Sequence, residues 1–227
     1  ISAVDFTQKS IAQSTPYPCA TNTITVTIAT SVGLLNTCGD AAGIGNGVYP
    51  LITISGLDGS RDSLVGGSRL TSSTTSPFNS SATTLSSGSL EFSPLFDVVA
   101  GQSYVFSFTL TNQETGQAAA ADIVIDIDTL THASEDMVTD SGLLQPMYIM
   151  EPIVQGGSQT VVQQQTSHPC ALNRISITIT TNVPIFEICA PTLTLTGFTA
   201  SSTTSLDAGE LSMLGGTTSG PDISIVS

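Results

Sequence analysis

One segment of the sequence occurs twice, 151 residues apart. Residues 13–38 align with residues 164–189 without a gap. The identical pairs include Thr15 and Thr166, Pro18 and Pro169, Cys19 and Cys170, Asn22 and Asn173, and Cys38 and Cys189. After the second cysteine the offset falls to 141, where residues 50–56 align with 191–197, so the first copy carries a ten-residue insertion. Self-similarity over such a distance predicts tandem modules.

Both copies of the repeat have the pattern of β-strands. Residues 22–28 alternate Thr with Ile or Val, and residues 173–179 keep the same period of two. Such alternation is typical of antiparallel strands with one buried and one solvated face. Further strands are predicted over 51–55, 90–99, 103–111, 121–128, 147–154, 192–196 and 222–226. Gly, Pro, Asn and Ser separate these runs, which predicts an all-β fold of two tandem immunoglobulin-like β-sandwich modules.

The two predicted modules are unequal. Module 1 is expected at 14–155 and module 2 at 156–227, after an extended N-terminal arm at 1–13. The second copy spans about 64 residues from Gln164, short of the roughly 100 residues of a complete immunoglobulin-like sandwich. We therefore expect module 2 to lack its final strands, which leaves an apolar cleft and unpaired strand edges. The arm is the predicted donor strand for that cleft in another chain, through Val4, Phe6 and Ile11.

The cysteines repeat as well. Cys38 follows Cys19 by 19 residues, and Cys189 follows Cys170 by the same interval. Four cysteines allow three pairings, and the equal spacing favours one disulfide within each copy. Four reduced thiols are the alternative, whereas a zinc site is disfavoured because the chain has no C-x-x-C and only two histidines. Disulfides predict an extracellular or cell-surface location.

The charge excludes several classes of partner. Four Lys and Arg against 18 Asp and Glu give a formal net charge of -14. Nucleic acid and anionic membrane surfaces would repel such a chain. No stretch approaches the roughly 20 apolar residues of a membrane span, so we expect no membrane insertion.

Residues that could carry chemistry are few. Asp122, Asp126 and Asp128 alternate along one predicted strand and are weak calcium candidates, although a solvated strand face is favoured because EF-hand spacing is absent. No G-x-S-x-G motif is present, and we expect neither catalytic residues nor a cofactor. Asn79 begins an Asn-Ser-Ser sequon in a Ser/Thr-rich loop, which is either glycosylated or a bare polar loop.

An incomplete immunoglobulin-like module beside an extended arm resembles the subunits of extracellular fibrils and pili that assemble by donor-strand exchange. The resemblance concerns architecture and not a sequence motif. It implies a structural, non-enzymatic protomer of a helical homopolymer, in which the arm of one subunit enters the second sandwich of another. The alternative is a monomeric cell-surface adhesin or carbohydrate-binding module excised from a larger repeat protein, with glycans as its partners. Aromatic residues make up 5% of the chain and Trp is absent, which favours the filament.

Overall fold

The computed structural model describes residues 4–35, 50–60, 70–78, 83–86, 88–128, 134–153, 161–190, 192–195 and 222–225. These residues are nearly all β, with short 3-10 helices at Gly142–Leu144 and Glu187–Cys189. The chain divides into two compact units, unit 1 (Ile1–Glu151) and unit 2 (Pro152–Ser227). The division lies four residues before the predicted boundary between the two modules.

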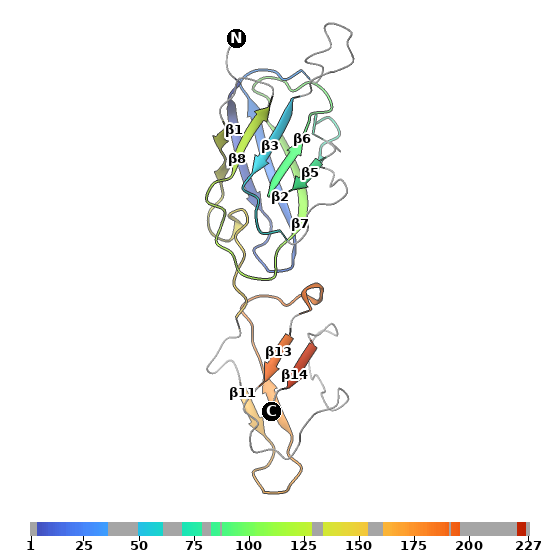
Figure 1. Ribbon diagram of the computed structural model, residues 1–227, viewed down its shortest axis with the longest axis vertical. Coiled ribbons are helices and arrows are strands. Elements are labelled where there is room, and N and C mark those ends of the chain that lie inside the picture. The colour runs from blue at the N-terminus through green and yellow to red at the C-terminus, as the bar shows by residue number, and fades with distance from the viewer. Residues whose placement is uncertain are drawn as a thin grey trace. The chain divides into compact units, whose positions relative to one another are not determined.

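Unit 1 contains two five-stranded sheets. The first sheet has the order β10-β1-β2-β7-β4, formed by Val138–Thr139, Phe6–Gln13, Thr21–Thr30, Tyr104–Thr111 and Thr71–Ser72. The second has the order β5-β6-β3-β8-β9, formed by Thr83–Ser86, Ser89–Phe92, Leu51–Ser55, Val124–Asp128 and Glu135–Asp136. Neighbouring strands are antiparallel except β1 and β10, which are parallel. In Figure 1 the strands of the second sheet lie over those of the first, as in a sandwich.

The core of unit 1 forms where the alternating side chains of both sheets meet. On β2, Ile24, Val26 and Ile28 are at most 1% exposed, as their period of two predicts. They belong to one cluster with apolar residues of β3, β6, β7 and β8. The ring of Phe106 of β7 packs edge-to-face against Phe92 of β6, with ring centroids 5.0 Å apart. Aromatic pairs of this kind add to the stability gained by burial, and this one joins the two sheets.

Several predicted strands are confirmed, and two differ. Strands β2, β3, β7 and β8 lie within or close to the predicted ranges. The strand expected over 90–99 ends at Phe92, because Pro94 cannot donate a ladder hydrogen bond. The strand expected over 147–154 does not form in its described part. Ile149 makes only a single bridge to Gln117, and Pro152 lacks the N–H that would extend the pairing.

The N-terminal segment is part of unit 1 and not a separate arm, which corrects the predicted boundary at residue 13. It forms β1, whose residues pair with β2 from Phe6↔Thr30 to Gln13↔Ile24. The predicted donor residues Val4, Phe6 and Ile11 are 5%, 5% and 2% exposed in the core of unit 1. Their burial explains the placement, because an isolated arm would leave these side chains in water.

Unit 2 contains two strand pairs among its described residues. Strands β11 (Val161–Gln164) and β12 (Ile175–Thr178) are antiparallel. Strands β13 (Thr192–Leu195) and β14 (Asp222–Ile225) are parallel. Strands β12, β13 and β14 fall within three predicted strand ranges.

Candidate assembly site

The first hairpin of unit 1 is built again in unit 2. Strands β1 and β2 pair with Gln13 opposite Ile24, and β11 and β12 pair with Gln164 opposite Ile175. Both residues of the second pair lie 151 positions after those of the first. Every other pair of β11 and β12 keeps this offset. The sequence repeat is therefore a structural repeat, with β11 in the place of β1 and β12 in the place of β2.

The turns of the two hairpins share their hydrogen bonds. The backbone N–H of Thr15 donates to Oδ1 of Asn22 at 3.3 Å, and the N–H of Thr166 donates to Oδ1 of Asn173 at 3.1 Å. Each asparagine also donates from Nδ2 to the glutamine that ends the preceding strand, at 3.0 Å in unit 1 and 3.3 Å in unit 2. Cys19 and Cys170 both have a left-handed backbone, with φ of 61° and 59°. Identical residues therefore build identical local structure.

The second hairpin differs from the first in what covers its outer edge. In unit 1, β7 pairs with the outer edge of β2, and Ile24 and Val26 of β2 are fully buried in the core that β2 shares with the opposite sheet. In unit 2, β12 pairs only with β11 among the described strands. Ile175, which stands at the position of Ile24, is 43% exposed. We call the β12 edge with Ile175 and Ile177, together with Ile179 just after the strand, the assembly site.

Further apolar side chains of the second hairpin and of the residues that follow it are also exposed. Val162 is 63% exposed, whereas Ile11 at the equivalent position of unit 1 is 2% exposed. Others with large exposed fractions are Leu172 at 97%, Ile188 at 62% and Ile185 at 47%. At the hairpin positions of Ile11 and Ile24, unit 2 therefore exposes the apolar side chain that unit 1 buries.

In unit 1, a network of buried side-chain amides lies where β2 meets the end of β7. In unit 1, Asn112 follows β7 directly, and both Asn22 and Asn112 are 0% exposed. Asn22 Nδ2 donates to Asn112 Oδ1 at 2.9 Å, and Asn112 Nδ2 donates to the carbonyl of Tyr17 at 2.9 Å. In unit 2, Asn173 stands at the position of Asn22 and is exposed. The buried amide network of unit 1 thus depends on Asn112, the residue that directly follows β7.

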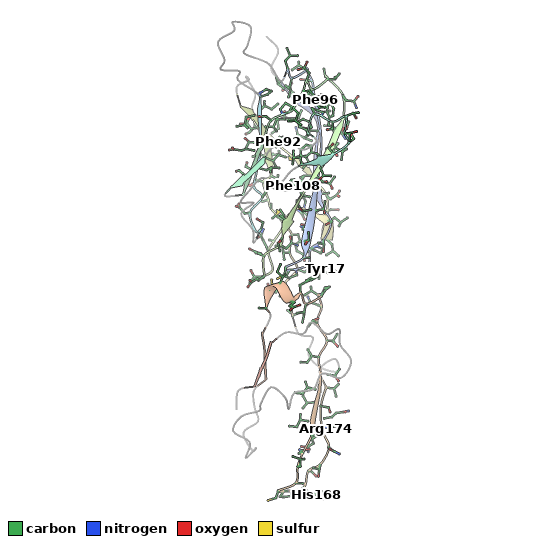
Figure 2. All side chains as sticks on the ribbon, turned by 90° about the vertical axis from the view of Figure 1, so that its right-hand side faces the viewer. Tyr17, Phe92, Phe96, Phe108, His168 and Arg174 are labelled. Atoms are coloured by element: carbon green, nitrogen blue, oxygen red, sulfur yellow. The ribbon has the colours of Figure 1, made fainter. Side chains whose placement is uncertain are left out.

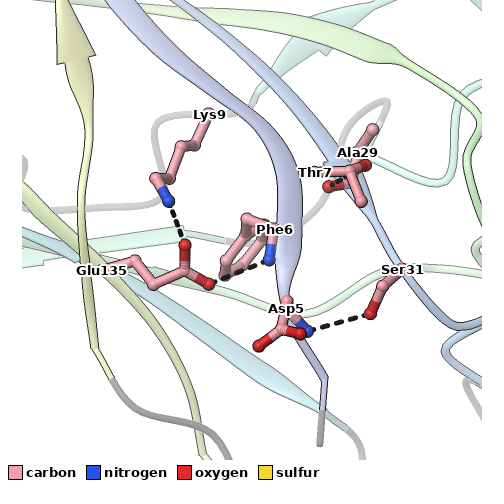
Figure 3. Close-up of polar contacts among 7 residues, drawn as sticks. All are labelled: Asp5, Phe6, Thr7, Lys9, Ala29, Ser31 and Glu135. Atoms are coloured by element: carbon pink, nitrogen blue, oxygen red, sulfur yellow. Dashed lines mark hydrogen bonds and ion pairs between the residues drawn. The ribbon is translucent and has the colours of Figure 1, made fainter.

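The predicted donor strand is held in place by contacts at its start, which Figure 3 shows. Lys9 forms an ion pair with Glu135 of β9. The same carboxylate accepts a hydrogen bond from the backbone N–H of Phe6 at 2.9 Å. The N–H of Asp5 donates to Oγ of Ser31 at 3.0 Å. A donor role for β1 in another chain would therefore require these contacts and the ladder with β2 to break first.

The cysteines do not follow the predicted pairing of one disulfide within each copy. Cys189 is disulfide-bonded, whereas Cys170 is a free, exposed thiol. The predicted bond between these two is therefore wrong. Cys170 lies in the hairpin turn just after His168, which Figure 2 labels at the tip of the hairpin, and Cys189 lies beyond the far end of β12. Cys19 is disulfide-bonded, and Cys38 lies outside the described residues.

The structure does not bring the three predicted calcium candidates together into a metal site among its described residues. Asp126 lies on β8 and accepts a hydrogen bond from the backbone N–H of Ile127, while Asp122 is exposed before the strand begins. Asp128 ends β8. The part of the chain that the structure describes contains no group of three or more Asp, Glu, His or Cys residues placed to hold a metal. Asn79 lies outside the described residues.

Sequence reasoning missed a groove of about 790 Å³ on unit 1. It lies beside β4 and β7, and its lining is mostly hydroxyl-bearing, including Thr71, Ser72, Thr75, Ser103 and Ser107. Val99 and Val105 also line it and are 61% and 52% exposed. The groove forms because β4 pairs with only Phe106 and Ser107 of β7. No sequence signal could reveal it, since its walls come from three segments that are far apart in the sequence, around Thr25, Thr71 and Ser103.

Among the residues placed by the structure, no helix is long and apolar enough to cross a membrane. Comparisons with protein-family models, with curated proteins and with solved structures found no match to this chain.

Proposed function

We propose that this is an extracellular structural protein of tandem immunoglobulin-like β-sandwich units. We further propose that it assembles into filaments through the edge of β12 in unit 2 that no other described strand pairs with. The order of the strands in unit 1 supports the immunoglobulin-like assignment. Strands β1, β2 and β7 neighbour one another as strands A, B and E do in that fold. Strands β3, β8 and β9 neighbour one another as C, F and G do.

The observation that carries the proposal is the opposite burial of equivalent isoleucines. Ile24 is 0% exposed and Ile175 is 43% exposed, although both lie in the same hairpin with the same register. Full burial of one isoleucine side chain stabilises a structure by about 1.5–3 kcal/mol. A strand that covered the assembly site would also satisfy the backbone groups of the β12 edge.

Assembly at this site favours an open polymer over a closed dimer. If the covering segment comes from a different surface of a second copy, the contact is heterologous and repeats from copy to copy. Burial of apolar surface is insensitive to salt, so such a filament should persist when ion pairs are screened. The net charge of -14 would keep finished filaments apart from one another.

Ile177→Asp tests this proposal. We expect the native chain to form regular filaments in negative-stain electron microscopy and large species in sedimentation velocity, and the variant to sediment as a monomer. A charge placed among apolar contacts is costly to bury. Ser176→Asp is the matched control, because Ser176 is exposed on the same strand and its side chain points to the opposite face; it should assemble like the native chain.

A native chain that stays monomeric at every concentration would contradict the proposal. Equal assembly of the native chain and the Ile177→Asp variant would show that filaments form elsewhere on the molecule. Tyrosine fluorescence should remain unchanged in both variants, which would show that unit 1 is still folded.

The hydroxyl-lined groove of unit 1 favours a second candidate function, adhesion to neutral glycans. Its hydroxyls can exchange hydrogen bonds with sugar hydroxyls, and Val99 and Val105 offer apolar contact to the sugar ring. We expect Ser103→Trp, which fills the groove, to abolish binding to a neutral oligosaccharide on a glycan array. Absence of binding by the native chain, or equal binding by the variant, would rule this candidate out.

A further inference from the structure

We propose that the segment which completes unit 2 is a strand of the β7 type that runs antiparallel to β12, and not the N-terminal strand. This inference rests on the proposed function, because it names the partner of the same assembly site. It follows from the duplication of the hairpin, because in unit 1 the strand β7 occupies the edge of β2 that corresponds to the edge of β12 left unpaired by the described strands of unit 2.

The edge of β12 that has no partner among the described strands corresponds to the edge of β2 that pairs with β7. In unit 1, β2 lies between β1 and β7. In unit 2, the place of β1 is already taken by β11, which pairs with β12 in the register of the first hairpin. The remaining edge therefore has the geometry of the β2–β7 interface. Because β2 and β7 are antiparallel, the incoming strand should also be antiparallel.

The offset of 151 residues predicts the register of the incoming strand. In unit 1, Ile24 lies opposite Phe108 and Val26 lies opposite Phe106. Ile175 and Ile177 should therefore lie opposite residues equivalent to Phe108 and Phe106. The incoming strand needs large apolar side chains at alternate positions, which is the pattern of β7.

The N-terminal strand does not have this pattern. Its inward apolar residues Phe6 and Ile11 are five positions apart. The strand accommodates that spacing through a register shift between Phe6 and Gln8. Laid along β12 in a regular ladder, β1 would bring one of these two side chains to the solvated face, because successive side chains of a strand alternate between faces.

The amide network predicts an asparagine at the end of the incoming strand. Asn112 joins the side chain of Asn22 to the carbonyls of Thr15 and Tyr17. Unit 2 repeats the asparagine as Asn173, with the same contacts to the turn before it. An asparagine in the position of Asn112 would complete the second network and bury it.

The charge of Arg174 favours an acidic residue in the incoming strand, at the position equivalent to Thr109 of β7. Arg174 stands where unit 1 has Thr23, and Thr23 lies opposite Thr109 of β7. Arg174 directly precedes β12 and is exposed. A glutamate opposite it would form a cross-strand ion pair, which is favourable in antiparallel sheets.

The test uses peptides with the sequence of residues 104–112 and the full chain. A fluorescently labelled peptide should bind saturably in an anisotropy titration, and a scrambled peptide should not bind. The Thr109→Glu form of the peptide should bind about two- to fivefold more tightly at low salt. The Asn112→Ala form should bind about tenfold more weakly, because it loses the amide hydrogen bonds.

Variants of the chain locate the binding. Ile177→Asp should abolish binding of the peptide, whereas the control Ser176→Asp should retain it. Arg174→Ala should remove the advantage of the Thr109→Glu peptide without weakening the unmodified peptide. The inference is overturned if the peptide does not bind, if Ile177→Asp binds it normally, or if a peptide of residues 4–13 binds more tightly.

The two proposals fail in different ways. Filaments that depend on Ile177, together with no binding of the β7 peptide, would keep the proposed function and overturn this inference. Binding of the peptide at Ile177 by a chain that never forms filaments would keep β12 as an acceptor for a β7-type strand and overturn the proposed function.

Discussion

Replacement of Asn22 by alanine should lower the free energy of unfolding of unit 1 by about 4 kcal/mol. The side chain of Asn22 is fully buried and donates to the amide oxygens of Gln13 and Asn112. It also accepts from the backbone N–H of Ser14. Alanine would leave the two buried amide oxygens without this donor, and each orphaned group costs about 1–3 kcal/mol.

Urea unfolding followed by tyrosine fluorescence measures this effect in unit 1 alone, because all four tyrosines lie before residue 151. The matched control is Asn173→Ala. Asn173 makes the equivalent bonds to Gln164 and Thr166 but is exposed, so water can replace them. Its alanine variant should leave the unfolding of unit 1 unchanged. An Asn22→Ala variant as stable as the native chain would show that the network does not stabilise the hairpin.

Phe106→Ala should destabilise unit 1 by about 3–5 kcal/mol. Phe106 is 0% exposed, and its ring packs against Phe92 of the opposite sheet and against Phe78. Removal of the ring leaves a cavity between the sheets that the surrounding side chains fill only in part. The urea midpoint of the tyrosine signal should fall accordingly.

The neighbouring residue provides the control for this variant. Val105 precedes Phe106 on β7 but is 52% exposed, and Val105→Ala should change stability by no more than about 0.5 kcal/mol. If the two alanine variants were equally stable, the inward face of β7 would not form the core that joins the sheets.

The alternation of residue types predicts the central strands of unit 1, because the same alternation determines which side chains are buried. It does not predict β1 as a strand of unit 1. A register shift after Phe6 breaks the period of two there, so the segment has the pattern of an irregular arm. Strands β4, β9 and β10 are two residues long each. Such short strands depend on the neighbour that they pair with and leave no periodic signal.

The sequence repeat predicts an incomplete second module, and the structure adds that β12 pairs along one edge only among the described strands. The pairing of an edge depends on the order of the strands in the sheet, which the pattern of residues does not predict. The repeat also draws attention to Asn22 and Asn173, but their roles differ because of Asn112, which lies 90 residues beyond Asn22. The spacing of the cysteines was misleading in unit 2, where Cys170 is a free thiol.

The parallel pairing of β1 with β10 determines how unit 1 would carry mechanical tension. The chain enters unit 1 through β1, and β10 is its last strand. Ser10 and Ile11 lie beside Val138 and Thr139 in the same direction. A force that pulls the two ends of the unit apart would slide these strands past each other and stretch all their bonds at once, whereas an antiparallel pair at the ends would open one bond at a time. Such a force would therefore load the β1–β10 pair in shear.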